Sequence, residues 1–145
     1  MEDTNKIIRA YLAAQAGLTA IVGAGVDCRI STRPIKEGMA LPALTFNTTG
    51  GVSNPNIYDP VTDDGIVDPS VQFTCWADNP IGARALYEAL RRVLFGLNME
   101  TVTFNGNDHQ IKFATEQVIG QDREDVDIPK YFSVITFYGF EILAK

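Results

Sequence analysis

The sequence predicts an α+β fold, a single domain over residues 1–145 with a mainly antiparallel sheet and two principal helices packed on one face. Two segments repeat apolar residues at helical spacing, and several others alternate apolar and polar residues as strands do. The composition, 46% apolar and 21% charged, is that of a globular protein. A chain of 145 residues can bury a core without metals or disulfides.

The first predicted element is an amphipathic helix that begins near residue 4. Asp3 or Thr4 can cap its N-terminus, because both side chains accept hydrogen bonds from backbone N–H groups. Gly17 is predicted to end the helix, and residues 19–22 to add a further turn before the break at residues 23–25. The apolar positions of this helix are Ile7, Ile8, Tyr11, Leu12 and Leu18.

Two strands are expected next. Residues 26–31 alternate apolar and polar side chains, which predicts a strand with one face in solvent. Residues 41–48 are expected to form the second strand, with Leu44 and Phe46 on one face and polar side chains on the other. The apolar positions of the first of these strands are Val26, Cys28 and Ile30.

Residues 50–69 hold three prolines, three glycines and four aspartates between two strong strand signals, which predicts a long excursion or an irregular hairpin. A loop of this length is uncommon in a compact domain unless it is functional. A calcium loop is disfavoured, because aligning Gly65 with the required glycine puts Pro60 and Thr62 at ligand positions. The acidic residues of this segment are Asp59, Asp63, Asp64 and Asp68.

A strand over residues 70–77 and a long helix after it carry the clearest patterns in the chain. Asp78 or Asn79 can cap the helix, and Pro80 suits its first turn. The helix has a broad apolar stripe, so it is expected to pack on the sheet. The apolar positions are Val71, Phe73 and Cys75 in the strand, and Ala83, Leu86, Tyr87, Leu90, Val93, Leu94 and Leu97 in the helix. Trp76 and Tyr87 are predicted to be core residues rather than a binding surface.

The remaining third of the chain is expected to complete the sheet. Residues 101–104 and 109–119 predict a hairpin that turns through Asn105-Gly106 or Gly106-Asn107. A second polar loop is predicted at residues 121–130, and residues 131–143, apolar on both faces, predict a central strand. The acidic residues of the second loop are Asp122, Glu124, Asp125 and Asp127.

The chemistry-bearing residues do not predict an enzyme, a metal site or a cofactor site. His109 is the only histidine, and beside a tight turn it is expected to be solvated. Cys28 and Cys75 are far apart and are expected to be buried reduced thiols, as in a protein kept in a reducing cytoplasm. The net charge of −6, without a basic cluster, argues against nucleic-acid binding, and no segment is long and apolar enough to span a membrane.

The order of these signals resembles the tail terminator, or tail completion, family of long-tailed bacteriophages. The resemblance covers nearly the whole chain in order, although its pieces are patterns of residue types rather than chemical motifs. Residues 50–69 depart from the family pattern by their length. The matching segments are GLTAIVG at 17–23, LPALTF at 41–46, VQFTCWAD at 71–78, ARAL at 83–86 and YFSVITFY at 131–138.

This resemblance implies a structural virion protein, made in the host cytoplasm, that acts without a cofactor and has no catalytic residues. It implies a homo-oligomeric ring, a hexamer, that caps the tail tube, stops its polymerisation and offers a docking surface to the head connector. The expected partners are therefore other copies of the chain, the tail tube protein and the connector or neck protein. Two alternatives stay open, a head-to-tail joining protein of the neck and a small ligand-binding domain or enzyme.

At least eight of the eighteen acidic residues fall in the two polar loops, four in each. In a ring, these loops are expected to face the tube, the lumen or the connector. Acidic lumen walls would repel DNA, so that a genome could slide past without binding.

Overall fold

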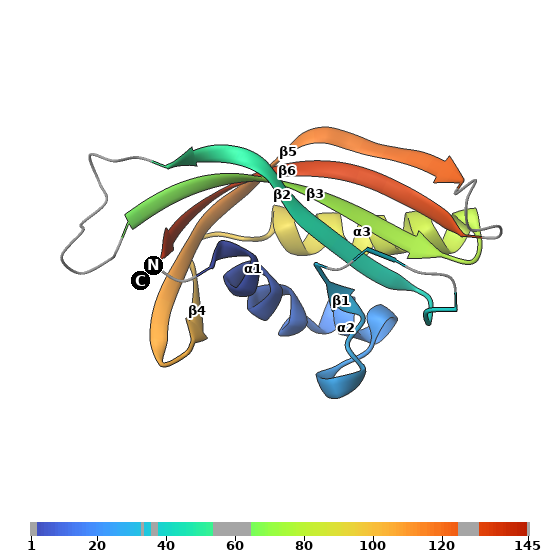
Figure 1. Cartoon of the computed structure of the whole chain (residues 1–145), viewed down its shortest axis with the longest axis horizontal. Coiled ribbons are helices and arrows are strands. Elements are labelled where there is room, and N and C mark those ends of the chain that lie inside the picture. Colours follow the sequence, from blue (N-terminus) through green and yellow to red (C-terminus); the bar gives the residue numbers. More distant parts are fainter. Residues whose placement is uncertain (1–2, 33, 36–37, 54–64, 125–130, 145) are drawn as a thin grey trace.

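The chain forms a mixed sheet with three α-helices on one face, in a computed structural model that describes residues 3–32, 34–35, 38–53, 65–124 and 131–144. Among these residues the sheet has six strands in the order β1-β2-β3-β6-β5-β4. The sheet arches over the helices (Figure 1). The elements are α1 (Thr4–Ala13), α2 (Ala16–Val22), a 3₁₀ turn (Gly25–Asp27), β1 (Ile30–Ser31), β2 (Ala43–Ser53), β3 (Gly65–Ala77), α3 (Pro80–Phe95), β4 (Glu100–Phe104), β5 (Asn107–Glu124) and β6 (Phe132–Ala144).

The predicted α+β class is confirmed, with one refinement of the sheet. β1 pairs with β2 in parallel, whereas the other neighbouring strands are antiparallel. The prediction that the last strand is central is also confirmed, because β6 lies between β3 and β5.

The N-terminal helix begins as predicted but ends earlier. The Asp3 side chain accepts a hydrogen bond from the Asn5 N–H at 2.9 Å, so Asp3 is the N-cap of α1. The chain then breaks at Ala14–Gln15, and Gly17, predicted to stop the helix, lies inside α2. A Cβ on Gly17 would lie 3.9 Å from a methyl group of Val93, so the glycine marks where α2 passes close to α3.

The strand predicted over residues 26–31 is wrong for most of its length. Gly25, with φ +62°, opens a 3₁₀ turn, and the Val26 side chain is fully exposed. Only Ile30–Ser31 pairs with β2. The Arg29 guanidinium fixes this segment by donating to the carbonyls of Pro42 and Ile21, at 2.7 and 3.1 Å. Local turn geometry and one arginine therefore override the alternating pattern.

The excursion predicted over residues 50–69 is an irregular hairpin at its base. β2 continues to Ser53 and β3 begins at Gly65, with a bulge between Thr48 and Gly50. Gly51 has φ +131° and no room for a Cβ against the backbone of β3 opposite it, so only glycine fits there. Residues 54–64 lie outside the described part of the chain.

α3 is the predicted long helix. Asn79 caps it by accepting from the Gly82 N–H at 2.6 Å, and Pro80 occupies its first position. Its apolar stripe packs on the inner face of the sheet, the face that carries the core. The buried side chains of this layer include Phe46 of β2, Phe73 and Cys75 of β3, Val134 and Phe140 of β6, and Ala83, Leu86, Tyr87, Leu90 and Leu94 of α3.

The β4–β5 hairpin turns through Asn105 and Gly106, one of the two predicted turns, with φ +52° and +77°. His109, predicted to be solvated, is instead fully buried. It pairs with Val102 of β4 and lies on the same strand face as buried Ile111. A position near a turn did not place this side chain in solvent, because the strand directs it into the core.

Candidate functional site

The eight acidic residues predicted to line two loops do not form one site in the described part of the chain. Asp68 and Asp122, together with Glu124, lie on strands rather than in loops. The second predicted loop is wrong at its start, because residues 121–124 of β5 pair with β6. The other five lie outside the described residues: Asp59, Asp63, Asp64, Asp125 and Asp127.

Asp68 and Asp122 belong to opposite ends of the sheet. Asp122 pairs with Val134 near the start of β6, whereas Asp68 follows Val67, which pairs with Ile142 near the end of β6. Asp122 forms an ion pair with Arg84 at 3.0 Å, and both side chains are exposed. An exposed pair of this kind contributes roughly 0–1 kcal/mol, so it is weak evidence for a special role.

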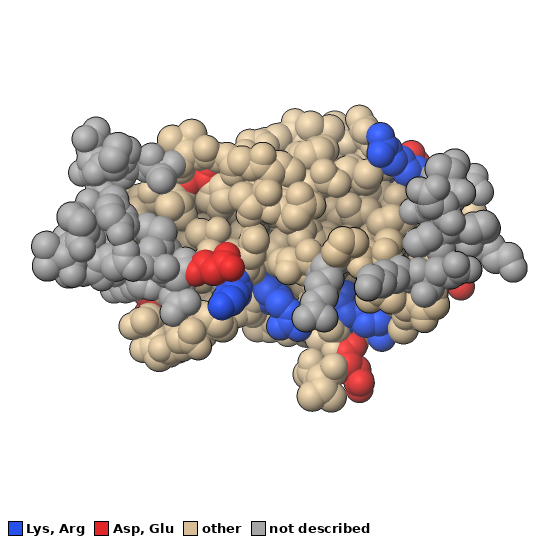
Figure 2. Space-filling view, in the orientation of Figure 1, with Lys and Arg blue, Asp and Glu red and all other residues tan. Residues whose placement is uncertain are grey.

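The outer face of the sheet lies opposite the core, and the described helices do not cover it (Figure 1). Its charged groups include Lys112 and Glu141, which pair at 2.9 Å, so this pair adds no net charge. Trp76 belongs to this face, contrary to its predicted place in the core, and donates to the Thr45 hydroxyl at 3.0 Å. In Figure 2 the blue and red groups gather mainly along the lower edge, over the helices, and the strands above are mostly tan.

A hollow of about 400 Å³ lies on this outer face, between the base of the β2–β3 hairpin and the middle of β5 and β6. Gly139 of the central strand β6 contributes to this hollow, because a glycine has no side chain to fill the space above it. Phe113 at its rim is 47% exposed, and Val52 across from it is 66% exposed. The hollow is open and shallow, so it suits contact with another surface better than capture of a small molecule.

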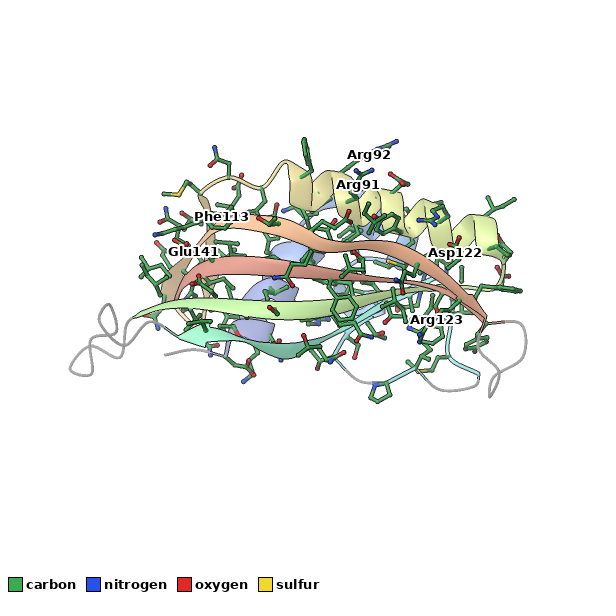
Figure 3. All side chains as sticks on the ribbon, turned by 90° about the horizontal axis from the view of Figure 1, so that it is seen from above. Arg91, Arg92, Phe113, Asp122, Arg123 and Glu141 are labelled. Atoms are coloured by element: carbon green, nitrogen blue, oxygen red, sulfur yellow. The ribbon has the colours of Figure 1, made fainter. Side chains whose placement is uncertain are left out.

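The sheet has two margins that lack a neighbouring strand among the described residues. β1 covers β2 only at Leu44 and Thr45, which leaves residues 46–52 uncovered, and we name these the β2 margin. β4 covers β5 only over residues 107–111, and residues 113–119 form the β5 margin. Seen from above, β2 and β5 border the four long strands on opposite sides (Figure 3).

The two margins differ in the protection common at sheet edges: the β2 margin has one bulge, between Thr48 and Gly50, whereas the β5 margin has a register irregularity on each side of Val118 and the inward-facing Glu116. Residues 43–53 contain no charged residue and no proline, although edge strands usually carry one or the other. The β5 margin exposes the apolar side chains of Val118 and Ile119, 38% and 72% exposed. Sequence analysis did not identify either margin, although the uncharged run in β2 was a signal that could have pointed to it.

The C-terminal end of α3 presents a second group of exposed side chains. Phe95 is 90% exposed, and Arg91 and Arg92 project from the same helix (Figure 3). A hollow of about 250 Å³ separates Phe95 from β5 and is also lined by Ala114 and Thr115. Aromatic and arginine side chains dominate the energetics of many protein interfaces, so this end of α3 is suited to a protein partner.

A carboxylate between α3 and the sheet is held by hydroxyl groups. Tyr87 and Tyr138 donate to the same Glu116 oxygen at 2.7 and 2.9 Å, and Thr136 lies 3.3 Å from it. Arg91 lies 4.0 Å from the other oxygen. One oxygen of this carboxylate is therefore occupied by hydroxyl groups of the fold, which indicates a structural group that joins α3, β5 and β6.

The titratable groups near this cluster are poorly suited to chemistry at neutral pH. Burial raises the pKa of Tyr138, and its hydrogen bond to Glu116 raises it further. Burial likewise raises the pKa of Tyr87 and, strongly, that of the Cys75 thiol. These groups stay protonated, so they are weak nucleophiles and weak bases. Both cysteines are free thiols, Cys75 buried and Cys28 partly exposed.

No group of three or more metal-ligating side chains comes together within the described part of the chain. Among the same residues, no helix has both the length and the apolar character needed to cross a membrane.

The comparisons with known proteins give one informative result. No family model matches the chain, and no curated protein sequence matches it. A solved structure with a similar fold is a chain of the virion of a native gene transfer agent particle. The two have a TM-score of 0.58 and 12% sequence identity, over 96% of this chain and 93% of that chain. The similarity therefore extends over the whole fold, and at this identity it concerns the fold alone.

Proposed function

We propose that this chain is a structural protein of a phage-like virion that caps the tail tube as a ring. The ring stops polymerisation of the tube and gives the head connector a surface on which to dock. The observation that carries the proposal is the fold shared, over nearly the full length of both chains, with a component of a virion particle. The sequence pattern resembles tail terminators independently of that fold.

The surfaces of the described chain support an assembly role. A ring needs two different surfaces on each subunit, because each copy contacts its two neighbours through unlike patches. The chain offers unlike surfaces at opposite sides of its sheet, the β2 margin and the β5 margin. A catalyst would instead require convergent polar groups with shifted pKa values in a cleft, and the buried hydroxyls of Tyr87 and Tyr138 are consumed by Glu116.

The acidic residues keep their proposed place at the lumen, the tube or the connector. Substituting Asn for the four aspartates of residues 59–68 removes four charges and changes the size of each side chain little. We expect slower DNA ejection or weaker docking of heads. Unchanged ring assembly, head joining and infectivity would contradict this role of the segment. The four residues are Asp59, Asp63, Asp64 and Asp68.

Deletion of the gene, followed by electron microscopy of the particles, tests the proposed function directly. A missing tail terminator leaves tails of uncontrolled length with detached heads. Tails of normal length without heads would instead favour a head-to-tail joining protein of the neck. Unaffected virions would contradict both roles and leave a ligand-binding domain or an enzyme as the remaining alternative.

A further inference from the structure

We infer that neighbouring copies of this chain join by main-chain pairing of the β2 margin of one copy with the β5 margin of the next, so that the sheet continues from subunit to subunit. This inference rests on the proposed ring, and it names the surface and the partner that build it. The partner is a second copy of this chain rather than the tube or the connector.

The first argument is the direction of the backbone groups of β2. The Leu44 N–H donates to the Arg29 carbonyl of β1 at 2.9 Å, so it points away from β3. Backbone groups alternate sides along a strand, and the pairing of residues 43–48 with β3 is regular. The N–H groups of Phe46 and Thr48 therefore also point away from β3, toward the side where no described strand lies.

The second argument is the state of the β5 margin. Gly120 ends it, because its N–H donates to the Tyr87 hydroxyl at 3.1 Å and its carbonyl accepts from Arg84 at 3.4 Å. Before Gly120, β5 pairs regularly with β6 over residues 113–116, and the side away from β6 has no described strand. This short regular run suits a ladder of a few residues with another strand.

The third argument is complementarity between the two margins. They border the sheet on opposite sides, so pairing one with the other joins subunits head to tail, which is the contact that a closed ring requires. The β2 margin carries no charge, so it does not repel the acidic surface of a second copy. A partner of opposite net charge is therefore not needed at this edge.

The outer face supplies positions for a direct test. Asn47 of β2 and Thr115 of β5 are both exposed, and both lie on the outer face of the sheet. Asn47 follows Phe46, which is buried on the inner face, and Thr115 pairs with Gly139, which follows Tyr138 on the inner face. In a continuous sheet, side chains on the same face of adjacent strands lie roughly 4.5–8 Å apart, counting direct and diagonal neighbours. Each residue of register shift moves the pair about 3.3 Å farther apart, so a flexible thiol cross-linker that spans roughly 15 Å bridges it over shifts of up to about four residues.

The experiment mixes two single-cysteine copies, Asn47→Cys and Thr115→Cys, each with Cys28→Ser because Cys28 is partly exposed. Native Cys75 stays, since it is fully buried. Rings are assembled alone or on tail tubes and treated with the cross-linker, and covalent dimers are measured on a denaturing gel. The matched control replaces Thr115→Cys with Thr101→Cys, an exposed position on β4. We expect at least about tenfold more dimer from the first pair than from the control.

A proline substitution provides a second readout. Thr48→Pro removes an N–H that points away from β3, so no internal pairing is lost, whereas Thr48→Val keeps the N–H. Both variants lose the hydrogen bond of 2.6 Å between the Thr48 hydroxyl and the Asn5 side chain. We expect Thr48→Pro to weaken the association of neighbouring subunits about tenfold relative to Thr48→Val. A tenfold change corresponds to about 1.4 kcal/mol for each contact between subunits.

The outcomes separate the two proposals. Rings that form without the 47–115 cross-link, or with equal dimer from the control, overturn the margin pairing and leave the capping role standing. Thr48→Pro rings as stable as Thr48→Val rings overturn the margin pairing as well. If the chain forms no rings, either alone or on tail tubes, and the gene deletion leaves tails normal, both proposals are overturned.

Discussion

The two faces of the same strands differ in what they contact. On β3, Phe73 and Cys75 face the helices and are fully buried, whereas Gln72 and Trp76 face outward and stay partly exposed. One face therefore carries the free energy of folding, and the other remains available for contacts with other molecules. The contrast teaches that a substitution of adjacent residues in one strand can separate stability from assembly.

The largest expected effect is the loss of a core side chain from the inner face. Phe73 is fully buried and packs against the rings of Phe46, Tyr138 and Phe140, with centroids 5.5 to 6.1 Å apart. We expect Phe73→Ala to lower the free energy of unfolding by about 3–5 kcal/mol. Gln72→Ala, one residue away on the outer face, should stay within about 0.5 kcal/mol in the same urea titration. Equal effects of the two variants would remove the distinction between the faces.

Substituting alanine for a glycine on each face tests the same difference between the faces by adding a methyl group. A Cβ on Gly120 would lie 2.7 Å from a Val134 methyl group and 2.8 Å from the Tyr87 ring, both in the core. A Cβ on Gly139 would meet only the end of the exposed Gln117 side chain at 2.7 Å. We expect Gly120→Ala to cost about 1–3 kcal/mol of stability and Gly139→Ala to cost much less. Thermal unfolding of the two variants measures the difference.

The inner face should also respond to alkaline pH. The pKa of Tyr138 is raised in the folded state, so the folded chain keeps this proton above pH 10, where an unfolded tyrosine loses it. The contribution of the Tyr138 proton to the free energy of unfolding is therefore fully present below about pH 10. Above that pH it declines by about 1.4 kcal/mol per pH unit. Urea titrations between pH 9 and about 11 should show a shallower decline for Tyr138→Phe. Parallel declines in the two proteins would contradict this coupling.

At the outer face, the apolar side chain of Phe113 should matter less for folding than for assembly. Phe113 is 47% exposed at the rim of the hollow on that face, so Phe113→Ser should change the free energy of unfolding by less than about 1 kcal/mol. Ring formation, followed by electron microscopy or native mass spectrometry, should nevertheless weaken. Intact rings together with reduced stability would place Phe113 in the folding of the subunit instead.

Helices and strands that bury one face were predictable, because their apolar residues recur at the spacing of a helix or a strand. α3 shows its stripe and its Asn79 cap, and β2 shows the Leu44 and Phe46 alternation that the structure confirms. The fold class followed from these elements. The parallel pairing of β1 did not, because only Ile30 and Ser31 take part in it.

The predictions that failed depend on contacts between distant segments. Asp122 has the polarity of a loop residue, but β6 draws it into a strand, with register irregularities between Glu116 and Gln121 that no local pattern reveals. His109 follows a turn, yet pairing with β4 sets which face of the strand it occupies. The margins arise in the same way, since a strand edge is open only when the order of the whole sheet is known.

The central place of β6 has a consequence for the order of events during synthesis. β3 and β5 both depend on β6 for their inner pairing, and β6 is the last of the described strands to leave the ribosome. Until residues 132–144 emerge, the earlier strands have no completed sheet to join, and their non-local pairing must wait. A nascent chain therefore completes the pairing of β3 and β5 with β6, and with it the sheet, only after residues 132–144 have emerged.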